Sequence, residues 1–338
     1  METGSVEMSK TDDFPVDMVY LWCDGKDPEF LRRKAEFSEE AVGADEEAVS
    51  RVRFFDNEEL KYSLRSLEKY APWIRHVFIV TDRQKPEWLD TENPKVTIVD
   101  HSEIMPKELI PCFNSSVIER YIGFIPGLSE HFLYANDDGF FGPKVSKGFF
   151  FRDGKPIVRM WYYGRQKNLR TIAQFREYVA DNFYGKPIVN AHAAVRAKNH
   201  LKDDMPFLEM HHNIDAYVKT DYVNTFLKYK EELDRYVSRF RSTEDIQRVL
   251  FGLEMLLNER GELHILEQYH KVRRLFFILK RTPLESYYSD ADRKQILILW
   301  CLRPMLFCIN NSGAKESGNK MERMYLEHRF PKKSSFEK

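Results

Sequence analysis

The stretch HFLYANDDGFFG, residues 131–142, ends a short apolar run in two adjacent carboxylates. The run Phe132–Tyr134 lacks helical spacing, and its aromatic and branched residues favour a strand buried between two packing layers. Asn136, Asp137 and Asp138 follow it, and ligands of open α/β sheets bind beyond the carboxyl ends of the strands. Their carboxylate and amide oxygens are suitable ligands for a Mg²⁺ or Mn²⁺ ion that is also bound to a diphosphate. The stretch predicts a nucleotide-sugar site with a metal ion, and the alternative interpretation is a solvated Asn-Asp-Asp-Gly turn.

Three further apolar runs precede this stretch, at Val16–Trp22, His76–Thr81 and Val96–Val99. Helical patterns between the runs favour parallel pairing. We therefore predict a Rossmann-like, glycosyltransferase-A-like α/β fold with a mostly parallel sheet and a largely helical C-terminal part. The predicted organisation is a disordered leader (1–15), a nucleotide-sugar-binding core (16–163), a mainly helical part that completes the active site (164–330) and a mobile tail (331–338).

The overall composition excludes several classes of protein. The 338 residues carry a formal net charge of −1, so no global field attracts nucleic acid. Four cysteines stand without metal-binding or disulfide spacing, and no signal sequence or membrane-spanning run is evident. The expected location is the cytoplasm.

Polar residues also follow the first strand and precede the first long helix. After Val16–Trp22 come Asp24, Gly25 and Asp27, where glycine permits close approach of a phosphate or base and a carboxylate can bind ribose, base or metal. A plain turn explains the same residues. Further along lie Arg53, Asp56 and Asn57, of which Asn57 is expected to cap the helix and Arg53 to hold a phosphate or to form a surface pair with Asp56.

A second helix start is predicted at Asn114 and Ser115, where free backbone N–H groups favour a phosphate, although ordinary capping explains both residues. Downstream, Gly148–Tyr163 indicates a hairpin, and His192 is expected after a short strand in a structural role.

Two long helices are predicted in the C-terminal part, at Thr220–Phe240 and after a cap at Ser242 or Thr243. His212 precedes the first and Arg241 the second, and we expect them to converge as a base beside an anion clamp. The alternative is that His212 caps a helix and that Arg241 pairs with Asp245 at the surface. The segment His270–Lys280 is basic and aromatic, which suits either a peripheral membrane contact or a core helix with solvated charges.

Four blocks of the chain resemble the stealth family of sugar-phosphate transferases. They are VYLWCDGKDP (19–28), the long region from Arg53 to Asp138 with FNSSVIE and HFLYANDD, the region from His212 to Asp245 with RFRSTEDI, and LFCINN (306–311). The last block departs from the family pattern, because Asn311 stands where Asp is usual. An amide binds a divalent ion more weakly than a carboxylate does and cannot accept a proton.

The resemblance implies transfer of a hexose-1-phosphate or N-acetylhexosamine-1-phosphate from a UDP-sugar to a saccharide hydroxyl, with release of UMP, in capsule or exopolysaccharide synthesis. Mg²⁺ or Mn²⁺ on the acidic triplet would neutralise phosphoryl charge, and His212, or otherwise Asp24 or Asp27, would take the proton. Two alternatives stay open, a metal-dependent glycosyltransferase that releases UDP and a non-catalytic carbohydrate-binding protein. The residues implied in substrate binding are Gly25, Arg53, Asp56, Asn57, Asn114, Ser115, Asp245 and Asn310.

Overall fold

The computed structural model describes residues 13–37, 56–143, 145–163, 169–180, 182, 184–202, 206–266, 285–290, 293–310 and 316–338. Most of the predicted leader, Arg53, the segment His270–Lys280 and Asn311 lie outside these residues.

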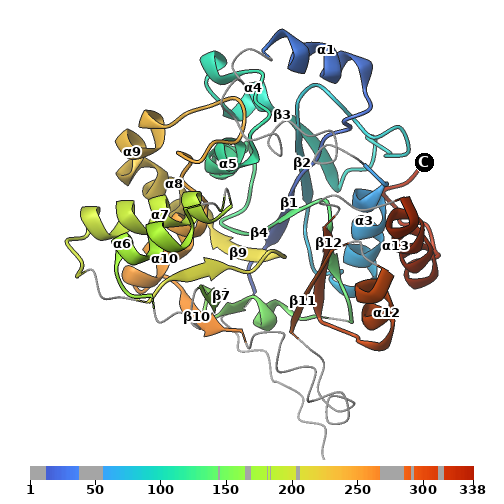
Figure 1. Ribbon diagram of the computed structural model, residues 1–338. Coiled ribbons are helices and arrows are strands. Elements are labelled where there is room, and N and C mark those ends of the chain that lie inside the picture. Colours follow the sequence, from blue (N-terminus) through green and yellow to red (C-terminus); the bar gives the residue numbers. More distant parts are fainter. Residues whose placement is uncertain are drawn as a thin grey trace, which may run out of the picture.

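A five-stranded sheet in the order β3-β2-β1-β4-β9 forms the centre of the molecule (Figure 1). Strands β1 (Val16–Leu21), β2 (Val77–Thr81), β3 (Val96–Asp100) and β4 (His131–Asn136) are parallel. Strand β9 (Asp215–Val218) joins β4 in the antiparallel sense. The four predicted strands therefore belong to one mostly parallel sheet, and the predicted fold class is confirmed.

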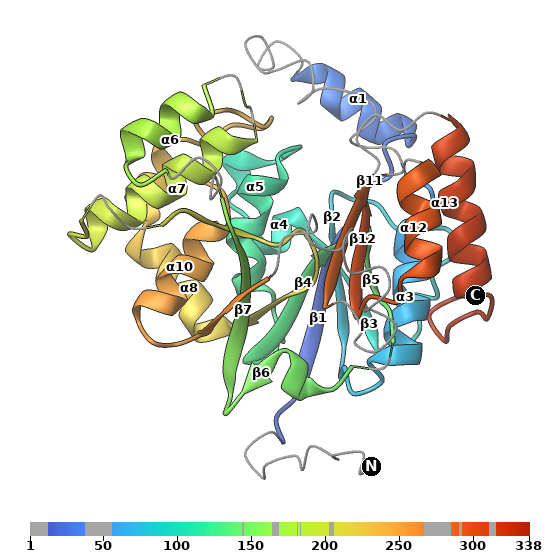
Figure 2. The same ribbon diagram turned by 60° about the horizontal axis from the view of Figure 1, so that its bottom comes forward.

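Both faces of the central sheet are covered, which explains why its strands read as continuous apolar runs. Along β1, Val19 and Leu21 pack into one buried cluster and Met18 and Tyr20 into another. Figure 2 shows helices α7 (Gly185–Lys198), α8 (Lys219–Lys228) and α10 (Val249–Leu257) on one side of the sheet. Helices α3 (Glu59–Tyr70), α12 (Arg293–Cys301) and α13 (Glu316–Arg329) lie on the other side.

Several other helices lie in the connections between these elements. They are α1 (Pro28–Glu36), α4 (His101–Ile104), α5 (Ser115–Ile118), the 3₁₀ helix η4 (Glu119–Phe124), α6 (Ile172–Tyr178) and α9 (Lys230–Arg235). No helix among the described residues is both long and apolar enough to cross a bilayer.

The predicted hairpin consists of β6 (Phe151–Arg152) and the longer β7 (Lys155–Tyr162), which are antiparallel. Asp153 and Gly154 form its turn with φ angles of 50° and 75°. Two central turn residues with positive φ match the twist of the flanking strands, so the hairpin expected within Gly148–Tyr163 is confirmed. Strand β7 also pairs with β8 (Leu208–Met210) and β10 (Glu262–Ile265).

A three-stranded sheet starts directly after the acidic triplet. Strand β5 (Gly139–Phe141) pairs antiparallel with β12 (Leu306–Asn310), which in turn pairs with β11 (Ser286–Asp290). At Gly142, which follows β5, an added Cβ would lie 1.8 Å from the carbonyl oxygen of Pro304. This close approach requires glycine and holds β12 beside the triplet.

Several predicted helix boundaries are wrong. The segment Thr220–Phe240 is not one helix, because α8 ends at Lys228, α9 ends at Arg235 and the buried Phe240 stacks on Phe113 at 5.2 Å between ring centroids. His192 lies inside α7 and does not follow a strand. Tertiary packing overrides helical spacing in the first place, and in the second the short run expected as a strand is part of a helix.

Two predicted helix caps are also wrong. Helix α3 begins after Glu58, whose φ is 65°, so Asn57 is not its cap. Helix α10 begins only at Val249, and not after Ser242 or Thr243, because the side chain of Asp245 is engaged with neighbours outside the helix.

The C-terminal residues are packed, in contrast to the mobile tail that the sequence suggested. Phe336 is buried, and the carboxylate of Glu337 lies 2.6 Å from the guanidinium of Arg65 on α3. The backbone of Glu337 also forms an isolated antiparallel β-bridge with Leu89, which lies between β2 and β3. The segment thus packs against α3 and the connection between β2 and β3.

Candidate active site

The acidic triplet lies at the carboxyl end of β4, where the sequence placed it. Asn136 is the last residue of the strand, and its side-chain oxygen accepts a hydrogen bond from the Tyr134 hydroxyl at 3.0 Å. Burial, together with the charges of Asp138 and Asp56, raises the pKa of Asp137 well above its ordinary value. The triplet is therefore a region of concentrated negative charge.

Two further acids share this region. Glu59 at the start of α3 is buried, and burial with the charges of Asp137 and Asp56 raises its pKa well above the usual range. Burial also raises the pKa of Asp56, and Asp24 adds to that shift. Because carboxylates crowded in this way ionise more easily beside a cation, the residues fit the predicted Mg²⁺ or Mn²⁺.

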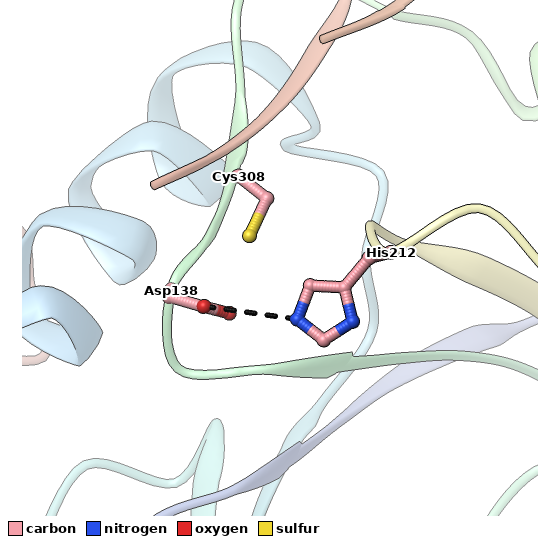
Figure 3. A group of neighbouring side chains, drawn as sticks. All are labelled: Asp138, His212 and Cys308. Atoms are coloured by element: carbon pink, nitrogen blue, oxygen red, sulfur yellow. Dashed lines mark ion pairs between the residues drawn. The ribbon is translucent and has the colours of Figure 1, made fainter. Parts of the chain in front are cut away.

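His212 lies opposite the triplet, in the turn between β8 and β9. Its Nε2 atom is 3.9 Å from a carboxylate oxygen of Asp138 (Figure 3). The neighbouring His211 is buried, with Nε2 at 2.8 Å from Asp215 and Nδ1 at 3.1 Å from the Ser286 hydroxyl. Anchored by His211, the turn presents the partly exposed His212 to the site. The position of His212 depends on strand pairing, and not on the helix start that the sequence suggested.

Behind the turn lies a buried group of charges around Arg248. Its guanidinium pairs with Asp215, donates to the Tyr217 hydroxyl at 3.2 Å and lies 3.6 Å from Glu119. Although burial acts in the opposite direction, the Arg248 and His211 charges hold the pKa of Asp215 below its usual value. One cation between two carboxylates thus joins η4, β9 and the segment before α10.

Arg241 reaches the site from the segment before α10. Its guanidinium donates to the hydroxyl of Ser115, the first residue of α5. Asn114 caps α5 as predicted, and its amide nitrogen donates to both carboxylate oxygens of Asp245 at 3.1 and 3.0 Å and to the Phe240 carbonyl at 3.1 Å. Asn114 is fully buried, so it acts on the site by holding the segment that carries Arg241.

Some of these residues line one pocket. Its lining includes Asn136, His212, Arg241, Glu119 and Arg248. The structure therefore brings the predicted base and the predicted clamp to the same cavity as the end of β4, over more than 70 residues of intervening chain between Asp138 and His212.

The other predicted residues lie around this centre. The Asp27 side chain caps α1 by accepting from the Glu29 N–H at 2.9 Å and also accepts from Gln84 at 2.8 Å. The Asp24 carboxylate accepts from the Lys26 N–H at 2.8 Å across Gly25. This turn has the ordinary hydrogen bonds that the alternative interpretation required, while Asp24 stays close enough to affect Asp56.

Asn57 and Asn310 lie toward α13 and β11. The Asn57 amide donates to Glu322 on α13 at 3.3 Å, and the partly exposed Asn310 ends β12 opposite Asp290. Neither contact tests their predicted role in binding the substrate.

Sequence reasoning missed three residues of the site. Glu119 stands in the quoted motif FNSSVIE, but only the structure shows that it faces Arg248. Arg248 has the spacing of a solvated helix residue and is nevertheless buried. Cys308 lies beside Asp138 because Cys308 pairs with Gly139 across β12 and β5. Nothing in the local sequence indicates that pairing.

Comparison with known proteins places these motifs in a family. Residues 53–158 match the description Stealth protein CR2, conserved region 2. Over 257 residues the chain is 34% identical to the capsular polysaccharide phosphotransferase LcbA of Aeromonas hydrophila, which covers 74% of this chain and 67% of that protein. Over 313 residues it is 28% identical to the capsular polysaccharide phosphotransferase fcs1 of Haemophilus influenzae, covering 90% of this chain and 80% of that protein.

Other relatives are much longer than the matched region. The exopolysaccharide phosphotransferase CpsY of Mycobacterium tuberculosis is 49% identical over 145 residues, which are 42% of this chain and only 26% of that protein. Among solved structures, the galactosyltransferase LgtC with donor and acceptor sugar analogs aligns with a TM-score of 0.39 and 8% identity over 91% of this chain and 95% of that chain, too weakly to inform on substrate. The LcbA match, at 34% identity over two thirds of that protein, shows that the chain belongs to the stealth family of polysaccharide phosphotransferases.

Proposed function

We propose that the protein transfers a hexose-1-phosphate or N-acetylhexosamine-1-phosphate from a UDP-sugar to a hydroxyl of a saccharide acceptor, releasing UMP, in capsule or exopolysaccharide synthesis. The observation that carries the proposal is the shared pocket of Asn136, His212 and Arg241 at the carboxyl end of β4. In-line phosphoryl transfer needs a proton acceptor, fixed positive charge and neutralised phosphoryl oxygens. His212 offers the first and Arg241 the second, and a metal ion held by the neighbouring Asp137 and Asp138 would supply the third.

His212 is the proposed proton acceptor. Its Nε2 atom makes no hydrogen bond to the described residues, and Asp138 lies 3.9 Å away. A lone pair on Nε2 can take the proton of the acceptor hydroxyl as that oxygen attacks the sugar-linked phosphorus. The carboxylate stabilises the imidazolium that results.

Arg241 is the proposed phosphate clamp. The Ser115 hydroxyl fixes one guanidinium nitrogen, and the remaining N–H groups suit the equatorial phosphoryl oxygens. Asp137 and Asp138 would hold the Mg²⁺ or Mn²⁺, which when bound neutralises charge on the diphosphate. Asn136 would add an amide oxygen. The donor's sugar and nucleotide then lie between β4 and the segment before α10.

The test is the identity of the released nucleotide. The purified protein is incubated with a panel of UDP-sugars, Mg²⁺ and oligosaccharide acceptors, and nucleotides are separated chromatographically. Release of UMP that depends on metal and acceptor supports the proposal. Release of UDP identifies a glycosyltransferase that attacks carbon, and sugar binding without turnover identifies a binding protein, so either result contradicts it.

A further inference from the structure

Three different metal-ligating side chains converge beside the pocket, and the predicted function uses only two of them. The ligand atoms of Asp138, His212 and Cys308 all lie within 4.8 Å of one another (Figure 3). They come from three separate parts of the chain: Asp138 lies in the turn between β4 and β5, His212 in the turn between β8 and β9, and Cys308 on β12. Cys308 pairs with Gly139 on β5, and the N–H of Ile309 donates to the Asp138 carbonyl at 3.2 Å.

The geometry of His212 suits an ion between these side chains. Its Nε2 atom is inaccessible to solvent and makes no hydrogen bond to the described residues, although a carboxylate oxygen lies 3.9 Å away. That distance is too long for a hydrogen bond. It fits two ligands on one zinc ion, because Zn–N and Zn–O bonds of about 2.0–2.2 Å allow ligand separations up to ~4 Å.

The chemistry of the three ligands selects the kind of ion. A thiol sulfur and an imidazole nitrogen favour zinc-type transition metals, whereas Mg²⁺ prefers oxygen. We propose that Asp138, His212 and Cys308 form a three-ligand site for a zinc-type divalent ion, which shares Asp138 with the oxygen site on Asp137 and Asp138. As the sulfur–metal bond forms, the thiol proton passes to solvent. Three protein ligands leave the fourth tetrahedral position to water or a phosphate oxygen.

An ion in this site would affect catalysis, and this part of the inference rests on the proposed function. The ion takes the Nε2 lone pair that would otherwise accept the acceptor proton. It also engages Asp138, which the hard metal ion needs. A zinc-type ion at Asp138, His212 and Cys308 therefore opposes the transfer reaction.

The experiment measures Co²⁺ binding to the full chain, so its outcome is independent of turnover. Wild-type protein titrated with Co²⁺ should develop a near-ultraviolet thiolate-to-cobalt absorption band at one ion per chain, and Zn²⁺ but not Mg²⁺ should abolish it. Cys308→Ser should lose the band. His212→Ala should weaken Co²⁺ binding by roughly 10-fold or more, the scale of change that even outer partners of a metal site produce.

The matched control is Cys301→Ser, because Cys301 is the exposed free cysteine of the described residues. This variant should keep the band. Absence of the band in wild type, its survival in Cys308→Ser, or its displacement by Mg²⁺ at equal concentration would overturn the proposal. If Cys308→Ser fails to fold, as judged by far-ultraviolet circular dichroism, His212→Ala decides, since His212 is partly exposed.

Discussion

The role of His212 depends on one ring nitrogen that faces Asp138 across 3.9 Å. Replacing His212 with alanine removes the proposed proton acceptor but no contact to the nucleotide. We expect turnover to fall by roughly 10²–10⁴ while nucleotide-sugar affinity stays almost unchanged. Steady-state kinetics and calorimetric titration with the UDP-sugar measure the two quantities. His328→Ala on the exposed face of α13 is the control, and loss of donor affinity equal to the loss of rate would argue against a base.

Arg241 offers a sharper test, because the hydrogen-bonding geometry of its guanidinium can be separated from its charge by substitution. Arg241→Lys keeps the charge but loses the planar group of donors that matches a phosphate. If Arg241 clamps the transferred phosphoryl group, lysine should reduce kcat/KM nearly as much as alanine does. A lysine variant with near wild-type kcat/KM would show that Arg241 supplies only a general positive field. The unfolding midpoints of the two variants, compared with that of the wild type, show whether the fold is retained.

Among the elements, the connection between η4, β9 and the segment before α10 rests on the buried Arg248. Arg248→Met leaves Asp215 and Glu119 buried without their cation, so the free energy of unfolding should fall by about 3–5 kcal/mol. Urea unfolding followed by circular dichroism measures the change. The control is Arg32→Met, which removes an exposed arginine that pairs within α1 and should leave the midpoint unchanged. Equal effects of the two substitutions would contradict the structural role of Arg248.

The elements also show what the sequence can predict. The four parallel strands were predictable, because each contains an apolar run that ends in polar residues, and three of them, β1, β2 and β4, are buried on both faces along most of their length. The break after Lys228 and the late start of α10 were not, because they depend on contacts of Phe240 and Asp245 with a helix start more than 120 residues earlier. Helical spacing describes only local preference.

The site likewise contains residues that the sequence could predict and residues that it could not. Asp137, Asp138, His212 and Arg241 were predictable as candidates from residue type and from the family resemblance. Cys308 was not, because it enters the site through antiparallel pairing between β12 and a three-residue strand. Register between distant short strands leaves no local pattern in the sequence.

At the scale of the whole molecule, the acidic region predicts how stability depends on pH. The pKa of Asp137 is raised in the folded protein, so the folded state binds more protons than the unfolded state. Stability from this group is therefore greatest below the unfolded pKa of about 4 and is lost as pH rises toward the folded value. Without metal, Asp137→Asn should have a higher Tm than wild type at pH 8, and this difference should shrink at pH 5.

Metal ions should reduce that difference in Tm. Mg²⁺ stabilises the ionised carboxylates, so it should raise the Tm of the wild type at pH 8 and raise that of Asp137→Asn less. Differential scanning fluorimetry measures both effects, with Asp234→Asn on the exposed face of α9 as the control. A Tm difference between wild type and Asp137→Asn that does not vary with pH would contradict the assignment of the raised pKa.

The pairing of β5 with β12 also bears on how the protein emerges from the ribosome. Phe141 pairs with Leu306, so 165 residues must be synthesised after Phe141 before its partner exists (306 − 141 = 165). At translation rates of about 5–20 residues per second, this takes roughly 10–30 s. Over that interval the nascent chain carries β5 without its partner strand, and an unpaired strand edge can associate with other chains. Slow synthesis of residues 142–305 should therefore lower the yield of folded protein, and a chaperone that shields nascent chains should restore it.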